Sequence, residues 1–93
     1  MWFMDIKQKY AKRLRSLRNE AGISQEELAF RAKLDRTYIN SVENGKRNIS
    51  IVNIEKITKA LGISVSDFFN KTDFNWWFTV LLLRTSDRHL ALL

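Results

Sequence analysis

Residues 25–45 read QEELAFRAKLDRTYINSVENG, and this stretch decides how the chain folds. Two short amphipathic runs flank the connection at residues 33–35. Ser24, placed three residues before Glu27, predicts a capping box for the first run, and Asp35 is an acceptor suited to start the second. The inward positions fit one buried face, and all are apolar: Leu28, Ala29, Ala32, Leu34, Ile39 and Val42. This pattern predicts a helix-turn-helix whose helices cross closely at an alanine.

Helical patterns also precede this stretch. The chain has no proline and only three glycines, which favours an all-helical fold. A helix is expected from about Asp5 to Ala21, with Asp5 as its cap and Gly22 as its stop. Its apolar stripe comprises Ile6, Tyr10, Leu14 and Leu17.

Two further helices are expected after the central stretch. Ser50 caps a helix over residues 51–61 that ends at Gly62, with Ile54, Ile57 and Leu61 as its buried stripe. Ser64 caps a short helix that holds Val65, Phe68 and Phe69. The fold class is therefore all-α: a compact five-helix domain over residues 1–72, followed by a short apolar C-terminal extension at 73–93.

Composition narrows the classes of function. Sixteen Lys and Arg against ten Asp and Glu give a net charge of +6, and a basic surface attracts nucleic acid or an anionic membrane. With no cysteine and a single histidine, His89, no metal or other cofactor is expected. An enzyme is not expected either, because the chain has no paired carboxylates, nucleophile–base set or glycine-rich phosphate loop.

Neither a signal peptide nor a membrane span is expected from the sequence. The start, MWFMDIKQ, lacks the features of a signal peptide. The longest apolar stretch, residues 76–83, is far shorter than the roughly 20 residues of a membrane span. The cytoplasm is the expected compartment.

A family resemblance gives these helices a function. Gln25-Glu26-Glu27-Leu28-Ala29, followed by Ile39 and then by Val42-Glu43-Asn44-Gly45, resembles the DNA-binding domain of the phage repressor and Cro superfamily, also called the XRE type. The resemblance covers roughly residues 5–70. Within the superfamily, residues 34–39 together with Arg47-Asn48 are most similar to the controller proteins of restriction–modification systems. That resemblance implies a homodimeric transcription regulator on a palindromic operator in double-stranded DNA, with no evident small-molecule effector.

The resemblance also implies which residues meet DNA. In the superfamily the second helix of the motif enters the major groove. The positions implied to contact bases are Arg36, Thr37, Tyr38, Asn40 and Ser41. Asn40 is equally compatible with a solvated helix position. The positions implied to contact phosphates are Gln25, Asn44, Lys46, Arg47 and Asn48, and the alternative for the residues after the helix is a polar surface loop.

Three structural expectations follow from the same resemblance. Arg18 and Glu43 are expected to form a largely buried ion pair that ties the first helix to the recognition helix. Val65, Phe68 and Phe69 are expected at the dimer interface, although at least one phenylalanine fits the core as well. Lys33 stands where the superfamily commonly has glycine, so a left-handed lysine and a strained turn are expected.

Two other classes of protein stay open at this level. An antitoxin-like or other repressor would keep the DNA-binding domain and bind a partner protein through its apolar C-terminal tail. A membrane-surface protein would use Trp76, Trp77 and the nearby Arg84 as an interfacial anchor.

Overall fold

The computed structural model describes residues 5–71 and residue 74. Five α-helices follow one another in this part of the chain: α1 Ile6–Glu20, α2 Gln25–Ala32, α3 Arg36–Glu43, α4 Ile51–Leu61 and α5 Val65–Phe69. The described residues contain no strand, and the predicted all-helical architecture is confirmed. The predicted domain boundary after residue 72 and the extension at 73–93 lie outside the described residues, apart from residue 74.

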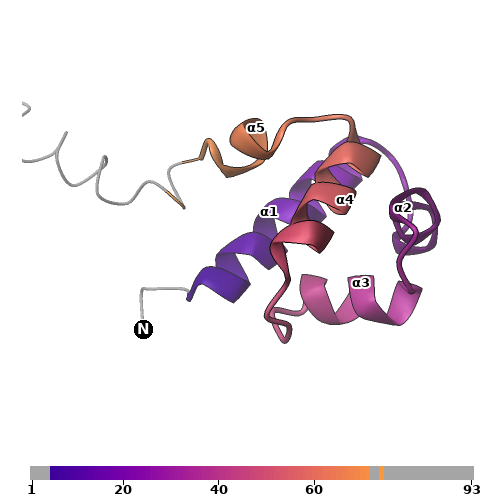
Figure 1. Cartoon of the computed structure of the whole chain (residues 1–93), viewed down its shortest axis with the longest axis horizontal. Helices are drawn as coiled ribbons and strands as arrows, with labels where there is room; N and C mark the ends of the chain where they lie inside the picture. Colours follow the sequence, from indigo (N-terminus) through magenta and orange to yellow (C-terminus); the bar gives the residue numbers. More distant parts are fainter. Residues whose placement is uncertain (1–4, 72–73, 75–93) are drawn as a thin grey trace, which may run out of the picture.

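The helix-turn-helix occupies one end of the domain. Helix α3 packs against both α1 and α2, while α2 also packs against α4, and α5 packs against α4 (Figure 1). The buried apolar core gathers residues from all five helices: Tyr10, Leu14, Leu28, Ala29, Ala32, Ile39, Val42, Ile57 and Phe68. Ala29 and Ala32 on α2 are both buried, as predicted for inward positions of the motif.

Side-chain caps start four of the five helices. Ser24 Oγ accepts the Glu27 N–H at 3.0 Å, but the Glu27 carboxylate bonds to Arg31 at 2.8 Å instead of completing the predicted capping box. A complete capping box forms at the start of α1, between Asp5 and Gln8. Asp35 is the N-cap residue of α3, but its side chain makes no capping hydrogen bond, so the predicted side-chain cap is wrong.

Helix ends share one hydrogen-bond pattern. After α1, α2, α3 and α4, an N–H group just beyond the helix reaches back five residues to a carbonyl in the last turn. This pattern places the residue before it in the left-handed region. Glycine occupies that position after three helices, and Lys33 occupies it after α2 with φ 58°. The expected left-handed lysine is therefore present.

The apolar stripe of α1 is shorter than predicted. Tyr10, Ala11 and Leu14 are buried, whereas Ile6 is 61% exposed. Ile6 is the first residue of the helix, where the neighbouring helices do not cover it fully, and its side chain lines a surface pocket.

Candidate nucleic-acid interface

The outer face of α3 presents polar side chains to solvent. Arg36, Thr37 and Asn40 are all exposed. Within residues 5–71 and 74, their side chains form no hydrogen bond or ion pair with the protein. The opposite face of α3 carries Ile39 and Val42, both buried in the core. The helix is thus fixed by its apolar face, and its first turn is available to an external ligand.

Two of the residues expected to contact bases are engaged within the protein. The Ser41 hydroxyl donates to the carbonyl oxygens of Thr37 and Tyr38, at 3.1 Å each, and accepts from Arg47 Nε at 3.2 Å. The Tyr38 hydroxyl accepts from Asn53 Nδ2 at 3.0 Å. Both side chains are half-buried. Both side chains are therefore held in place by partners within the protein.

The turn after α3 collects polar and basic residues on the surface. Asn44, Lys46, Arg47 and Asn48 are all exposed. Gly45 gives the turn its shape, since its φ is +71° and an added Cβ would approach Gln8 Cγ to 3.3 Å. The Lys46 N–H closes the turn by donating to the Ser41 carbonyl at 3.0 Å. The turn therefore holds two cations beside the end of α3.

Glu43 is a buried carboxylate that joins three helices. It is 1% exposed, and its oxygens accept from Arg18 Nε at 2.6 Å and Nη2 at 3.1 Å. The predicted ion pair with Arg18, itself 14% exposed, is thus present in the structure. The Gln25 amide also donates to Glu43, at 3.0 Å, and Arg15 donates to the Glu43 backbone carbonyl. These bonds orient α3 relative to α1 and α2.

Gln25 lies at the first position of α2, where unpaired N–H groups and the helix dipole favour an anion. One N–H of its amide is used by Glu43, which holds the side chain in place. The second amide hydrogen has no partner among the described residues. The placement is compatible with the expected phosphate contact, and the bond to Glu43 is a feature that the sequence did not indicate.

Three arginines of α1 form hydrogen bonds within the protein. Arg18 and Arg15 bind Glu43, and Arg13 donates to the carbonyls of Phe68 and Asp67 at 2.8 and 2.9 Å. These three arginines therefore brace the fold and complete the ends of α3 and α5.

The three α5 residues that were expected at a dimer interface differ in their burial. Phe68 is fully buried and stacks on Tyr10 with ring centroids 4.6 Å apart, so it belongs to the chain's own core. Val65 is 41% exposed. Phe69 is half-buried and contacts Phe74 edge to face at 4.9 Å. Of the three, Val65 and Phe69 are the residues that reach the surface.

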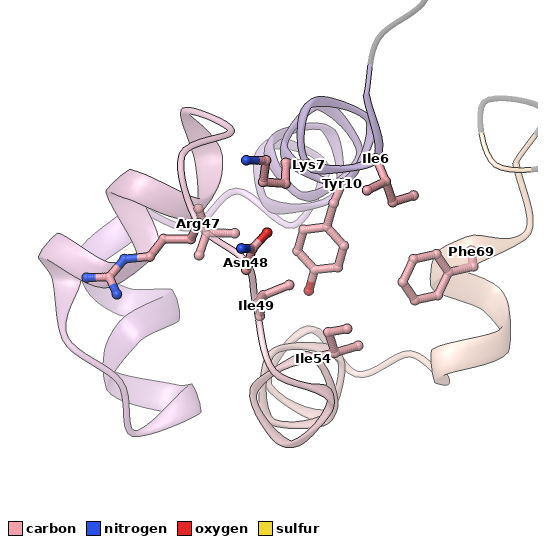
Figure 2. Close-up of a pocket in the computed structure, with 9 residues that line it drawn as sticks. Ile6, Lys7, Tyr10, Arg47, Asn48, Ile49, Ile54 and Phe69 are labelled. Carbon is pink, nitrogen blue, oxygen red and sulfur yellow. The ribbon is translucent and has the colours of Figure 1, made fainter.

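A pocket of about 200 Å³ is lined by residues of α1, of the segment between α3 and α4, and of α4 and α5. Figure 2 shows the Tyr10 ring among its lining residues, with the hydroxyl directed between Ile49 and Ile54 and Phe69 on the far side. The Tyr10 hydroxyl is buried and has no hydrogen-bond partner in the described part of the chain. Burial, with a smaller effect of Tyr38, raises the pKa of Tyr10 well above its ordinary value.

Other kinds of site find no support in the described residues. No group of three or more His, Cys, Asp and Glu side chains is arranged to hold a metal ion among them. In the same part of the chain, no helix has the length and apolarity to cross a membrane.

Comparison with known proteins places this architecture. Residues 14–68 match the family described as Helix-turn-helix. The control protein C.MunI of Mycoplasma sp. is 51% identical over 67 residues, which are 71% of this chain and 90% of that protein. The control protein C.BamHI of Bacillus amyloliquefaciens is 44% identical over 69 residues, 73% of this chain and 85% of that protein.

Solved structures agree with the sequence relatives. The restriction–modification controller protein C.AhdI of Aeromonas hydrophila matches with a TM-score of 0.66 and 49% identity, over 68% of this chain and 96% of that chain. The controller protein C.Esp1396I, solved as a tetramer on its natural 35-base-pair operator, matches with a TM-score of 0.68 and 38% identity, over 71% and 87%. The chain belongs to the helix-turn-helix family of the phage repressor and Cro type, among the restriction–modification controller proteins.

Proposed function

We propose that this chain is a sequence-specific transcription regulator that binds a palindromic operator as a homodimer and controls a restriction–modification system. The observation that carries the proposal is the exposed face of α3, where the side chains of Arg36, Thr37 and Asn40 have no partner among the described residues and lie beside a basic turn. The operator complex of the related C.Esp1396I supports it.

Each part of the surface has its own task in this proposal. Arg36 is suited to pair with guanine O6 and N7, a contact that discriminates between bases by roughly 1–3 kcal/mol. Thr37 offers a methyl group to thymine, and Asn40 offers an amide to adenine. Gln25, Asn44, Lys46 and Asn48 hold phosphates, which fixes the register of α3 without reading sequence.

Two variants test these tasks separately. Duplexes selected from random DNA by the wild-type protein define the operator. Arg36→Ala should then abolish the preference for the operator and leave weak, salt-sensitive binding. Lys46→Ala should weaken binding to all duplexes alike and reduce the slope of log affinity against log salt by about one unit. Failure of the wild-type protein to select any sequence, or equal effects of the two variants on specificity, would contradict the proposal.

The genetic setting supplies an independent test of the regulatory target. A gene for a restriction enzyme or a methyltransferase beside this one is expected, with the selected operator lying upstream of the coding region. A reporter driven by that upstream region should change its output when the protein is supplied, and Arg36→Ala should remove the change.

A further inference from the structure

Tyr38 is held from two sides by residues that follow the recognition helix. Asn53 Nδ2 donates to the phenol oxygen at 3.0 Å, and the Arg47 guanidinium carbon lies 4.9 Å from the ring centroid. The second distance is within the range of a cation–π contact. One contact fixes the tip of the side chain and the other covers its ring, so the Tyr38 side chain has a defined direction before any ligand arrives.

Asn53 is itself well anchored. It is the third residue of α4, and the Ser50 hydroxyl that caps this helix accepts the Asn53 backbone N–H at 3.2 Å. The cap fixes the backbone from which the amide reaches Tyr38. Asn53 is half-buried, and its amide bonds to Tyr38 alone among the described residues.

The direction of this hydrogen bond leaves the phenol with a free proton. Because the Asn53 amide donates, the Tyr38 oxygen is the acceptor, and its own O–H can still donate to an acceptor outside the protein. A base acceptor such as guanine O6 has the required chemistry.

Arg47 is also bonded to α3. Its Nε donates to the Ser41 hydroxyl, which in turn bonds to the Thr37 and Tyr38 carbonyls. In Figure 2 the Arg47 guanidinium points away from the pocket lining. The ring of Tyr38 therefore lies against a side chain that α3 itself holds.

We infer that Asn53 is a positioning residue for DNA recognition: its amide fixes the Tyr38 phenol on α3 and leaves the O–H able to donate to the ligand. The inference rests on the proposed function and adds a residue on α4 that does not belong to the recognition helix or its turn. Without Asn53, the phenol loses its partner and must be ordered during binding. This ordering lowers the affinity for the operator.

The test measures specificity in the full-length chain. Asn53→Ala should lower the ratio of affinities for the selected operator and for a scrambled duplex by about 3- to 10-fold, the range of a single neutral hydrogen bond. Binding to the scrambled duplex should stay unchanged. Asn70→Ala is the matched control, because Asn70 is exposed at the end of α5, away from α3 in Figure 1, and should leave the ratio unchanged.

A double-mutant cycle separates positioning from a general loss of stability. In a Tyr38→Phe background the hydroxyl is absent, so Asn53→Ala should cause no further fall in the ratio. An unchanged ratio for Asn53→Ala, or an equal fall in both backgrounds, would overturn the inference while leaving the proposed function intact. Absence of any sequence preference in the wild-type protein would overturn both.

Discussion

Tyr10 brings a hydroxyl into the core without a bonding partner in the described part of the chain. Its ring stacks on Phe68, so the aromatic part of the side chain is stabilising while the buried oxygen is a cost. We expect Tyr10→Phe at neutral pH to leave the free energy of unfolding unchanged or to raise it by about 1 kcal/mol. Urea denaturation measures this, and a loss of stability above 1 kcal/mol would show that the hydroxyl has a partner.

The same residue predicts a pH dependence. An unfolded tyrosine ionises near a pKa of about 10, whereas burial raises the pKa of Tyr10 in the folded chain. Below pH 10 both states are protonated. Above it only the unfolded state loses the proton, so stability falls with rising pH by up to about 1.4 kcal/mol per unit. The difference between wild type and Tyr10→Phe in free energy of unfolding should therefore widen from pH 9 to 11.

At the scale of the elements, the end of α2 is the strained joint. Lys33 adopts φ 58° where the other three helix ends of this kind have glycine, and a left-handed non-glycine residue costs roughly 1–2 kcal/mol. We expect Lys33→Gly to raise the free energy of unfolding by about 0.5–1 kcal/mol, because the added freedom of the unfolded chain offsets part of the gain. Thermal denaturation measures the change. Lys33→Ala removes the same charge and keeps the strain, so an equal gain from both variants would assign the effect to charge.

Glu43 links three elements, and its loss should be much more costly. Glu43→Ala leaves Arg18 and the Gln25 amide without their buried partner, and breaking such a pair typically costs about 3–5 kcal/mol. A fall in melting temperature on the order of 12 °C or more is expected. Glu26→Ala, which removes an exposed carboxylate from the first turn of α2, should change it by only a few degrees. A small shift for Glu43→Ala would contradict the tripartite role.

The elements were largely predictable because local chemistry marks their limits. Ser24, Ser50 and Ser64 accept N–H groups at helix starts, and Gly22 and Gly62 follow helix ends. Long-range polar partners were not predictable. Nothing in the periodicity says that a tyrosine on α3 meets an asparagine 15 residues later, or that Gln25 bonds to Glu43.

The inward face of α5 was also ambiguous, for a geometric reason. A helix of five residues makes less than two turns, so several adjacent apolar residues fit the core equally well. The structure places Phe68 inside and Val65 outside. The partners of Arg13 and Arg15 were not predictable for another reason, because a long basic side chain reaches both solvent and internal acceptors.

At the scale of the whole molecule, the surface of the domain is compatible with pairing. Ile51, Val52 and Val65 are exposed apolar residues on α4 and α5. A homodimer would bury such residues and place two recognition helices on half-sites about 34–36 Å apart. Of these two helices, α5 is the one that the sequence analysis expected at the dimer interface.

Val65→Asp tests the α5 interface without disturbing the fold. Val65 is 41% exposed at the first position of α5, where a carboxylate is favoured by the helix dipole. In a dimer the same carboxylate would be desolvated without a partner, so the dissociation constant should rise by about tenfold or more. Sedimentation equilibrium measures that constant, and circular dichroism verifies the helix content. Ser66→Asp adds the same charge one residue further along α5 and should have a smaller effect. Unchanged dimerisation of Val65→Asp would move the interface to another surface, for which Ile51 and Val52 on α4 are the next residues to substitute.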